Sequence, residues 1–332
     1  MRKRKILRCA AILALLLPLL FAGCRQKPAE GPRWIREDYI LPVNWDPISI
    51  QSAAGGTLSV VGYHRTGDEK ICLFTLTEGG GYTEKRELPE MERLRSPRWE
   101  GSTFYGLKDI DEERTFVRYD EEGNLLESRP TAGLMPDEPE FKPVEAVRAP
   151  DGTLFLMSYY GIAVVPPEGE ASAFRPGLHA EFDRLFLSPD GEAWVWERTQ
   201  RGWGLSRIDR DRVRLTDLVF LPEEPPQDWQ RQITLLGFDA EGRFLWAEKD
   251  GINAVVFGEE GVVTKIRLLD YDEEGLDVTK YAASLLPDRR TLVFSRQELE
   301  IPRLEGESDA EYQARTGGAK WLSRYIVLHP AG

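Results

Sequence analysis

Short runs of alternating apolar and polar residues, separated by polar turns, recur along the whole chain. In Leu185–Trp196 an apolar run stops at Ser-Pro-Asp-Gly-Glu and resumes as Ala-Trp-Val-Trp. Period-two alternation is typical of β-strands with one buried face, and an Asp-Gly pair permits the tight turn of a β-hairpin. The segment therefore predicts a strand, a turn and a second strand.

Variants of this hairpin recur down the chain, and their turns end at Gly56, Gly101, Gly152, Gly191, Gly242 and Arg289. The steps between these positions are 45, 51, 39, 51 and 47 residues. Such a period, built from short strands without a 3.6-residue pattern, is typical of propeller blades. Two further strand patterns per copy bring the count to four. We expect an all-β fold, a β-propeller of six four-stranded blades. Seven blades, or five with an irregular segment, stay open because 131–143 and 218–231 can hide or pad a strand.

The two ends of the chain complement each other. After the sixth hairpin turn only one strong strand pattern remains, Trp321–Leu328, so the last copy lacks a strand. Trp34–Ile40 precedes the first copy and can supply it, which closes the ring and removes open sheet edges. Within the last insertion, Ser308 and Glu311 have capping-box spacing for a short helix over Ser308–Gln313, although the lack of an apolar stripe leaves a loop as the alternative.

The N-terminus has the three parts of a secretory signal. Met1–Lys5 is basic, an apolar run follows to Ala22, and Gly23 precedes Cys24. This end resembles the lipobox of bacterial lipoproteins, which implies a diacylated Cys24 as the mature N-terminus. We expect a signal peptide over 1–23, a lipidated cysteine and tether over 24–32, and one propeller domain over 33–332. The protein would then lie outside the cytoplasm, held to the membrane by its lipid.

The net charge argues against one class of partner, and the cysteine content argues against an intramolecular disulfide. The chain has 43 Lys and Arg against 56 Asp and Glu, and five of the basic residues lie within 1–23, so the remainder has 38 against 56 and a net charge of −18. Such a surface repels nucleic acid, and we expect no nucleic-acid partner. Cys72 is the single cysteine outside the signal and the lipobox, so we expect a small buried hydrophobe and no intramolecular disulfide.

No catalytic or metal motif stands out. The three histidines, His64, His179 and His329, lack metal-ligand spacing, and a Gly-x-Ser-x-Gly elbow is absent from the sequence. The acidic clusters Asp109–Glu113 and Asp270–Glu274 lack the ligand alternation of a calcium loop and are interpreted as solvated turns. We therefore assign no catalytic residue, no metal and no cofactor.

Binding residues are expected on one face of the propeller. Connections between the first and second strands and between the third and fourth lie on one face, which we call the short-turn face. The other face, the long-loop face, receives every long segment: Pro130–Pro143, Leu221–Gln232, Leu269–Tyr281 and Gln297–Lys320. Because function concentrates in variable loops on rigid scaffolds, the candidate ligand-binding residues lie there. They are His64, Arg65, Tyr159, Tyr160, His179, Trp203 and Trp229, with Trp45 as a further possibility. The strand tryptophans Trp194, Trp196 and Trp246 are expected to pack between blades.

The lipobox ending in Cys24, together with the repeated Asp-Gly and Glu-Gly hairpins, resembles the lipid-anchored, propeller-containing lipoproteins of Gram-positive bacteria. The resemblance implies a cell-surface protein. We favour a monomeric, noncatalytic propeller that binds a glycan, peptide or protein through its long-loop face. A solute-capture component working with a membrane transporter is one alternative, and an exported hydrolase of the glycosidase type is another.

Overall fold

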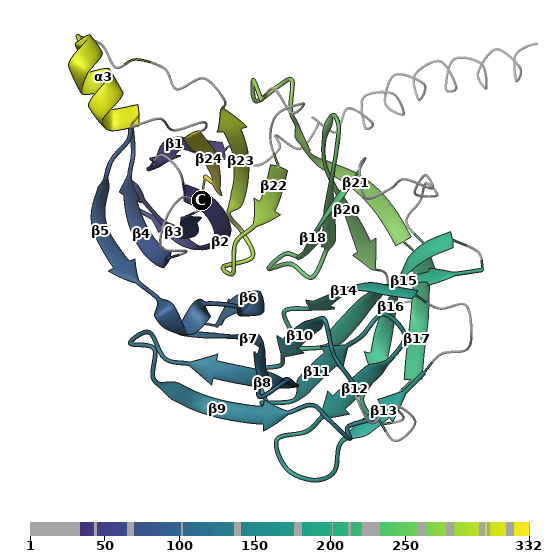
Figure 1. The fold of residues 1–332 in the computed structure, drawn as a ribbon. Helices are drawn as coiled ribbons and strands as arrows, with labels where there is room; N and C mark the ends of the chain where they lie inside the picture. Colours follow the sequence, from purple (N-terminus) through teal and green to yellow (C-terminus); the bar gives the residue numbers. More distant parts are fainter. Residues whose placement is uncertain are drawn as a thin grey trace, which may run out of the picture. The chain divides into compact units, whose positions relative to one another are not determined.

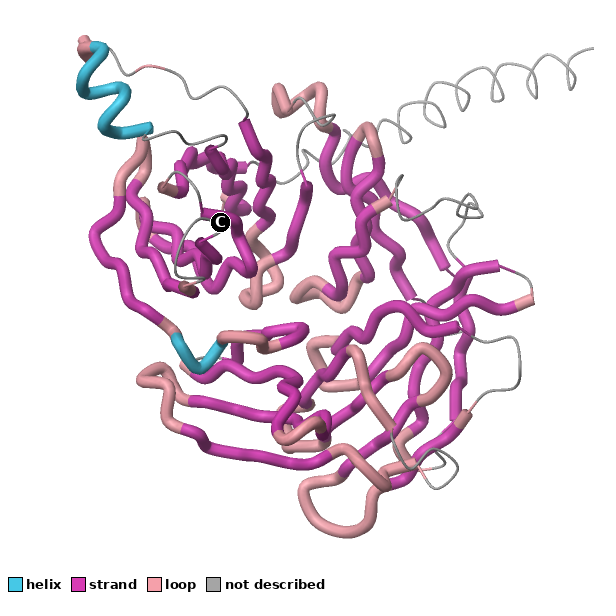
Figure 2. Tube along the Cα trace, viewed as in Figure 1, coloured by secondary structure: helices cyan, strands magenta, loops and turns pink. Residues whose placement is uncertain are grey.

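The computed structural model describes residues 34–42, 45–64, 70–100, 102–135, 141–175, 181–200, 202–211, 214–220, 233–257, 263–276, 282–298, 303, 306–316 and 322–331. The chain divides into two compact units, Met1–Ile35 with Pro330–Gly332 and Arg36–His329. The second unit holds nearly all of the described residues, and most of them are in strands (Figure 1, Figure 2).

The strands form six antiparallel, four-stranded sheets, which are the blades of a β-propeller. Blade 1 consists of β2 (Trp45–Ala54), β3 (Thr57–His64), β4 (Ile71–Thr77) and β5 (Tyr82–Glu87); blade 2 of β6 (Arg95–Glu100), β7 (Thr103–Ile110), β8 (Glu113–Tyr119) and β9 (Leu125–Pro130); blade 3 of β10 (Glu145–Arg148), β11 (Leu154–Met157), β12 (Ile162–Val165) and β13 (Ser172–Phe174). Blade 4 consists of β14 (Glu181–Leu187), β15 (Ala193–Thr199), β16 (Gly202–Asp209) and β17 (Arg214–Phe220); blade 5 of β18 (Thr234–Phe238), β19 (Phe244–Glu248), β20 (Gly251–Phe257) and β21 (Val263–Asp270); blade 6 of β22 (Ala282–Leu285), β23 (Leu292–Glu298), β24 (Leu322–Pro330) and β1 (Trp34–Leu41). The prediction of six four-stranded blades is confirmed.

Blade 6 joins the two ends of the chain. Its strand order is β1-β24-β23-β22, so the first strand of the chain forms the outer edge of the last blade. In the other five sheets the strands lie in sequence order. The predicted closure by the N-terminal strand is therefore confirmed. It gives the last blade the fourth strand that the C-terminal part of the sequence lacks.

The recurring hairpin turn has a common geometry. In four copies the residue that ends the turn donates its backbone N–H to the carbonyl three residues earlier, at 2.8–3.1 Å, and has a positive φ. These residues are Gly152, Gly191, Gly242 and Arg289, with φ of 91°, 81°, 78° and 59°. Glycine meets this requirement without steric cost. Turn side chains complete the motif, as where Asp239 Oδ1 accepts the N–H of Arg243 at 2.8 Å. The Asp-Gly pattern is therefore a backbone requirement of the blades.

The hydrophobic core lies between neighbouring blades, because alternate residues of a strand face opposite neighbours. In β15, Val195 joins a buried cluster with blade 3, while Trp194 and Trp196 join a cluster with Trp246 of blade 5. All three tryptophans are at most 7% exposed. The expectation that they pack between blades is confirmed.

Polar bonds connect the first strands of several blades. Arg98 of β6 contacts the Glu145 carboxylate of β10 at 2.6 Å and donates to the Leu185 carbonyl of β14 at 3.1 Å. The other Glu145 oxygen accepts the Leu185 N–H at 2.6 Å, so one partly buried ion pair joins three blades. Arg289, at the turn of blade 6, donates to the Leu187 carbonyl of blade 4 at 2.8 Å. Charged side chains that bond between strands in this way fix the blades relative to one another.

Helical structure is scarce among the described residues. A 3₁₀ turn, η1 (Pro89–Met91), follows β5, and α3 (Asp309–Thr316) lies between β23 and β24. Ser308 caps α3 as a capping box: its hydroxyl accepts the Glu311 N–H at 3.3 Å, and its own N–H donates to the Glu311 carboxylate at 2.9 Å. Of the two alternatives for this segment, the helix is the correct one. In the described part of the chain, no helix has the length and apolar character needed to cross a bilayer.

Replacing Gly191 by alanine should destabilise the protein more than replacing Gly242. Both residues have nearly the same positive φ, which costs an alanine about 1 kcal/mol. A Cβ on Gly191 would lie 2.9 Å from Pro150 Cδ of blade 3, whereas one on Gly242 meets nothing within 4 Å. Urea unfolding of the two variants measures the difference. Equal losses of unfolding free energy would show that the contact between the turns of blades 3 and 4 has no energetic weight.

Candidate functional site

The described strand ends that flank the long connections lie on the face that the sequence predicts. The strands of blades 1–5 follow in order, so the turns between their second and third strands and the links between blades share one end of each sheet. The longest intervals between strands separate β9 from β10, β17 from β18, β21 from β22, and β23 from β24. The first three are links between blades, and the fourth joins the second and third strands of blade 6, so all four are at the same end of the sheets. This end defines the long-loop face.

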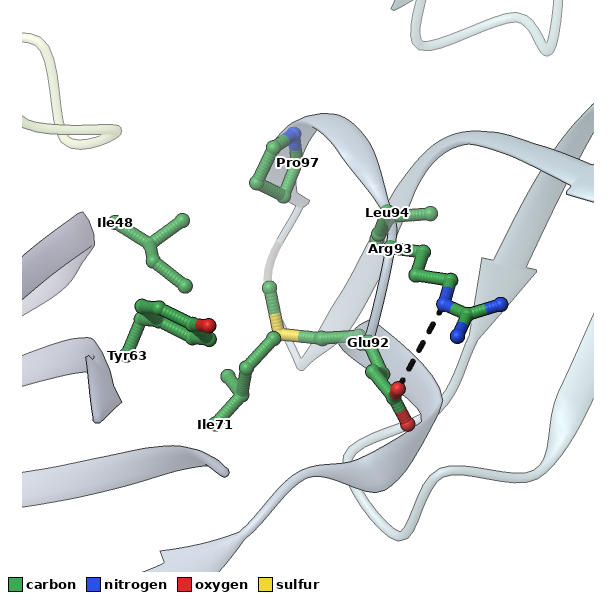
Figure 3. A pocket seen from close by; sticks show the side chains of 8 residues that line it. Ile48, Tyr63, Ile71, Glu92, Arg93, Leu94 and Pro97 are labelled. Carbon is green, nitrogen blue, oxygen red and sulfur yellow. Dashed lines mark ion pairs between the residues drawn. The ribbon is translucent and has the colours of Figure 1, made fainter. Parts of the chain in front are cut away.

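A pocket opens on this face between blades 1 and 2. Its volume is about 250 Å³. The lining consists of Ile48, Tyr63, Ile71, Met91, Glu92, Arg93, Leu94 and Pro97. In Figure 3, the side chains from blade 1 face those of the link that leads into blade 2. Six of the eight lining residues have an apolar or aromatic side chain, so the pocket can receive an apolar group.

The blade 1 wall is formed by the strand ends. The pairing of β2 with β3 is irregular between Pro47 and Ser49, and the intervening Ile48 is 37% exposed. A bulge of this kind redirects a side chain that would otherwise alternate with its neighbours. Tyr63 and Ile71 are paired across β3 and β4 at the same end of the blade. The three side chains therefore meet where blade 1 reaches the long-loop face.

The opposite wall is a short, tightly bonded link. Pro89 starts η1, and the Leu88 N–H donates to the Ile71 carbonyl at 2.8 Å. The Leu94 N–H donates to the Met91 carbonyl at 2.9 Å. Met91 is 2% exposed, so it forms the floor of the pocket and joins the core between the blades. Proline presets the backbone for such a turn, which places the link without a long loop.

The link and the start of β6 hold strained backbone. Arg93 has a φ of 61° and Ser96 a φ of 46°, a region that residues other than glycine rarely occupy. The Ser96 hydroxyl donates to the Val144 carbonyl of the next blade at 3.0 Å, which holds the strained segment. Strained residues that surrounding contacts hold in place cluster at functional sites. Two of them next to the same pocket mark this link as a candidate site.

The mouth of the pocket is charged. Arg93 Nε lies 3.7 Å from a Glu92 carboxylate oxygen, and both side chains are more than half exposed. An exposed ion pair contributes little to stability, so these two groups stay available to a ligand. Tyr63 adds a hydroxyl on the other wall (Figure 3). The site combines an apolar interior with a few polar groups that can orient what enters.

Two of the predicted residues, Trp45 and His64, are paired across β2 and β3 at the end of blade 1 where this pocket lies. His64 follows Tyr63, and its ring lies 4.8 Å from that of Trp45. Trp45 is 6% exposed and meets Phe74 edge to face at 4.7 Å, so it belongs to the core. Arg65 falls outside the described residues. A ligand contact by His64 stays a prediction.

Tyr159 and Tyr160 form an exposed aromatic pair on the long-loop face. They are 57% and 58% exposed, with ring centroids 6.5 Å apart, in the turn between β11 and β12. The turn is held by the Ser158 N–H, which donates to the Gly161 carbonyl at 2.9 Å, and by the Tyr159 carbonyl, which accepts the Phe182 N–H of blade 4 at 3.0 Å. A rigid turn therefore presents two rings to solvent, as their predicted binding role requires.

Trp203 is placed differently from the tyrosine pair. It is half-buried near the start of β16, and its ring is nearly parallel to that of Trp196, with centroids 6.1 Å apart. This packing gives Trp203 a structural role, while its ligand contact stays a prediction. His179, Trp229 and the lipidation residue Cys24 lie outside the described residues.

Sequence reasoning missed the pocket because it looked for long loops. Ile48, Tyr63, Met91 and Leu94 lie on strand ends and on a link of seven residues. One signal was present: Met91 and Leu94 stand between Pro89 and Pro97, in a connection expected to be polar. Apolar residues in a short link indicate that the link packs against something.

Other reactive groups are buried. Burial raises the pKa of the Glu197 carboxyl above its usual value. The Ser206 hydroxyl donates a hydrogen bond to this carboxyl, which partly offsets the effect of burial on the pKa. Burial also raises the pKa of the Cys72 thiol, which is fully buried as expected.

Thr291, His329 and Glu37 are in contact in the order of a hydroxyl–imidazole–carboxylate triad. Thr291 is 2% exposed, however, and its hydroxyl donates to Asp288 at 2.6 Å, so it is not open to a substrate.

The described residues contain no group of three or more His, Cys, Asp or Glu side chains arranged to bind a metal ion. Asp111 and Glu112, in the first acidic cluster, form a hairpin turn with φ of 49° and 68°. In the second, Asp270 Oδ1 accepts the Asp272 N–H at 3.0 Å. Both clusters are turns, as interpreted from the sequence.

The fold and this pocket define a six-bladed β-propeller with an apolar site between two blades. The sequence matches no known protein-family model and no curated protein. Among solved structures it is similar to a catalytically inactive virginiamycin B lyase from Staphylococcus aureus with quinupristin, at 13% identity and a TM-score of 0.49, over 82% of this chain and 87% of that one. A streptogramin B lyase is similar at 11% identity and a TM-score of 0.47, over 89% and 98%. Puromycin hydrolase is similar at 16% and 0.44, over 82% of this chain and 44% of its own. Similarity at these values carries no inference about what this chain binds.

The packing of the aromatic residues predicts different effects of their removal. Trp203→Ala should lower the free energy of unfolding by about 1–3 kcal/mol, because a half-buried ring stacked on Trp196 is lost. Tyr160→Ala should change it by less than about 0.5 kcal/mol, because that side chain is exposed. Urea unfolding measures both. A destabilised Tyr160→Ala variant would contradict the assignment of the pair as free binding surface.

Proposed function

We propose that the chain is an exported, lipid-anchored and noncatalytic propeller that binds an apolar side chain of a peptide or protein at the pocket between blades 1 and 2. The observation that carries the binding proposal is the pocket lining: a strained, tightly bonded link and three strand ends enclose an apolar space on the long-loop face. Apolar concave sites with a few polar groups are the usual form of a binding site.

The size of the pocket favours a side chain over a whole small molecule. Small-molecule sites commonly have volumes of about 300–1,000 Å³, and this pocket has about 250 Å³. Its lining favours a peptide over a glycan, because each buried sugar hydroxyl needs a hydrogen-bond partner. The exposed charges of Glu92 and Arg93 stand where the main chain of a peptide would leave the pocket. Tyr159 and Tyr160 offer a second contact on the same face.

The noncatalytic part of the proposal rests on the chemistry of the pocket. Its polar groups are one phenol, one carboxylate and one guanidinium, and the last two are exposed and paired. General acid–base or nucleophilic catalysis needs a proton acceptor within hydrogen-bond reach of a nucleophile, often with a perturbed pKa. The pairs of this kind described above, Ser206 with Glu197 in blade 4 and Thr291 with His329 in blade 6, are not among the pocket residues.

The anchor is proposed from the N-terminal sequence. A basic start, an apolar run and Ala22-Gly23-Cys24 have the form of a lipoprotein signal. A single acyl chain gives only reversible membrane binding, so the two or more chains of a lipoprotein would be needed for stable retention.

An Ile48→Glu variant tests the binding site. Blocked pentapeptides Gly-Gly-Xaa-Gly-Gly, with Xaa as Leu, Phe, Ala or Asp, serve as probes in saturation-transfer NMR with the protein. We expect the Leu and Phe peptides to bind and the Asp peptide not to bind. Glutamate at position 48 should weaken binding about tenfold or more, because a carboxylate in the pocket must be desolvated when an apolar group enters.

Val256→Glu is the matched control, because Val256 is also 37% exposed and lies on β20 of blade 5. It should leave peptide binding unchanged. Failure of the unaltered protein to bind the Leu and Phe peptides would overturn the proposed ligand class. An equal loss in both variants would move the site away from the pocket.

Mass spectrometry of the mature N-terminus tests the anchor separately. Expression in a Gram-positive host should give a protein that begins at Cys24 and carries two or three acyl chains, found in the membrane fraction. A Cys24→Ser variant should lose the lipid and leave the membrane. An unmodified Cys24 in the mature protein would exclude the anchor and leave the binding proposal untouched.

A further inference from the structure

A chain of polar contacts crosses the seam that closes the ring. Glu37 and Tyr39 belong to β1, and His329 to β24. One Glu37 oxygen, Oε2, lies 3.2 Å from His329 Nε2 and accepts the Tyr39 hydroxyl proton at 2.5 Å. On the other side of the imidazole, His329 Nδ1 lies 3.3 Å from the hydroxyl of Thr291. Thr291 directly precedes β23.

The hydrogen bonds of the Thr291 hydroxyl indicate which imidazole nitrogen of His329 carries a hydrogen. A threonine hydroxyl has one hydrogen and two lone pairs. That hydrogen is directed at Asp288 Oδ2, 2.6 Å away, while Asp288 Oδ1 accepts the backbone N–H groups of Arg290 and Thr291 at 2.9 Å. An Asp288 carboxylate surrounded by donors is an acceptor, so Thr291 can only accept from the imidazole. His329 Nδ1 therefore carries a hydrogen.

The contact between Glu37 and His329 indicates a second proton, at Nε2 of the imidazole. Burial and the bond to Glu37 raise the pKa of Tyr39, so this phenol keeps its hydrogen and donates it. Glu37 Oε2 then faces His329 Nε2, and two lone pairs at 3.2 Å would repel each other unless a proton lies between them. A carboxylic acid is a stronger acid than an imidazolium, so this proton resides on the imidazole. A doubly protonated His329 would be a cation between two carboxylates, Glu37 directly and Asp288 through Thr291.

We propose that the seam of the propeller is a proton-dependent latch, in which the doubly protonated His329 holds β1 against β24. The groups that face it are Glu37 and Tyr39 from β1 and Asp288 and Thr291 from the turn between β22 and β23. Glu78, in the turn after β4, acts on Tyr39 from a distance.

The sign of the pH dependence follows from the contacts. With the proton bound, the imidazolium donates to Glu37 and to Thr291, and the latch contributes its full stability. When rising pH removes the proton, Nε2 becomes an acceptor opposite a carboxylate, so the bond is lost and repulsion replaces it. β1 should then open more readily while the remaining blades stay folded, because a single edge strand opens locally at lower cost than the whole unit.

The first test determines the protonation state in the full-length protein labelled with ¹⁵N-histidine. A long-range ¹H–¹⁵N spectrum at about pH 6 should show both ring nitrogens of His329 in the protonated form, assigned by their loss in a His329→Gln variant. A neutral His329 ring at this pH, with β1 still protected, would overturn the proposal.

The second test measures amide hydrogen exchange in β1 at about pH 6 and about pH 8.5, corrected for intrinsic exchange. The protection of β1 should fall by about tenfold or more at the higher pH, while the protection of β19 in blade 5 stays constant. In His329→Gln the protection of β1 should no longer depend on pH. His64→Gln is the matched control and should keep the dependence of the unaltered protein. A dependence that survives in His329→Gln, or one that β19 shares, would overturn the latch.

Discussion

Closure of the ring is the constraint on which the other features depend. Each blade buries one face against the previous blade and the other against the next, so an open array would leave two apolar sheet faces and two strand edges in water. The chain avoids this by pairing β1 with β24, which places residues about 290 positions apart in one sheet. Tyr39 of β1 and Tyr325 of β24 are both fully buried in the cluster that joins blades 6 and 1. The seam is therefore packed like any other contact between blades, and its polar contacts lie beside that core.

The blades are fixed to one another by apolar packing and by a small number of charged side chains. The cluster around Trp196 and Trp246 supplies burial between blades 4 and 5, which is favourable and has little directional preference. Arg98 and Glu145 add directional bonds that join blades 2, 3 and 4. Arg289 adds one to the Leu187 carbonyl, which joins blades 6 and 4. We expect this partly buried ion pair to contribute more to the choice of one arrangement than to net stability. Apolar packing together with these directional bonds explains how a repeat with unequal spacing still forms one defined ring.

A rigid ring also determines where a binding site can form. The pocket between blades 1 and 2 needs no long loop, because Pro89 and the bonds around Met91 hold a short link against the ends of three strands. The positive φ of Ser96 is held by the bond of its hydroxyl to the Val144 carbonyl, just before blade 3. The exposed pair Tyr159 and Tyr160 is likewise held by backbone bonds on both sides of its turn. In the binding role proposed above, both features would keep their geometry without a ligand, which would lower the entropic cost of binding.

The sequence by itself determined the architecture, because strand alternation and the turn residues are local properties. The spacing of residues along the chain predicted three features: the positive φ at Gly191 and its equivalents, the missing strand of blade 6, and the capping box at Ser308. The interpretation of the three strand tryptophans as core was correct for the same reason. Only the tertiary structure revealed the pocket at Met91, the ion pair of Arg98 with Glu145, and the contact of His329 with Glu37. Each of these joins residues from different blades, and their meeting depends on the register and curvature of the ring, which no local pattern encodes.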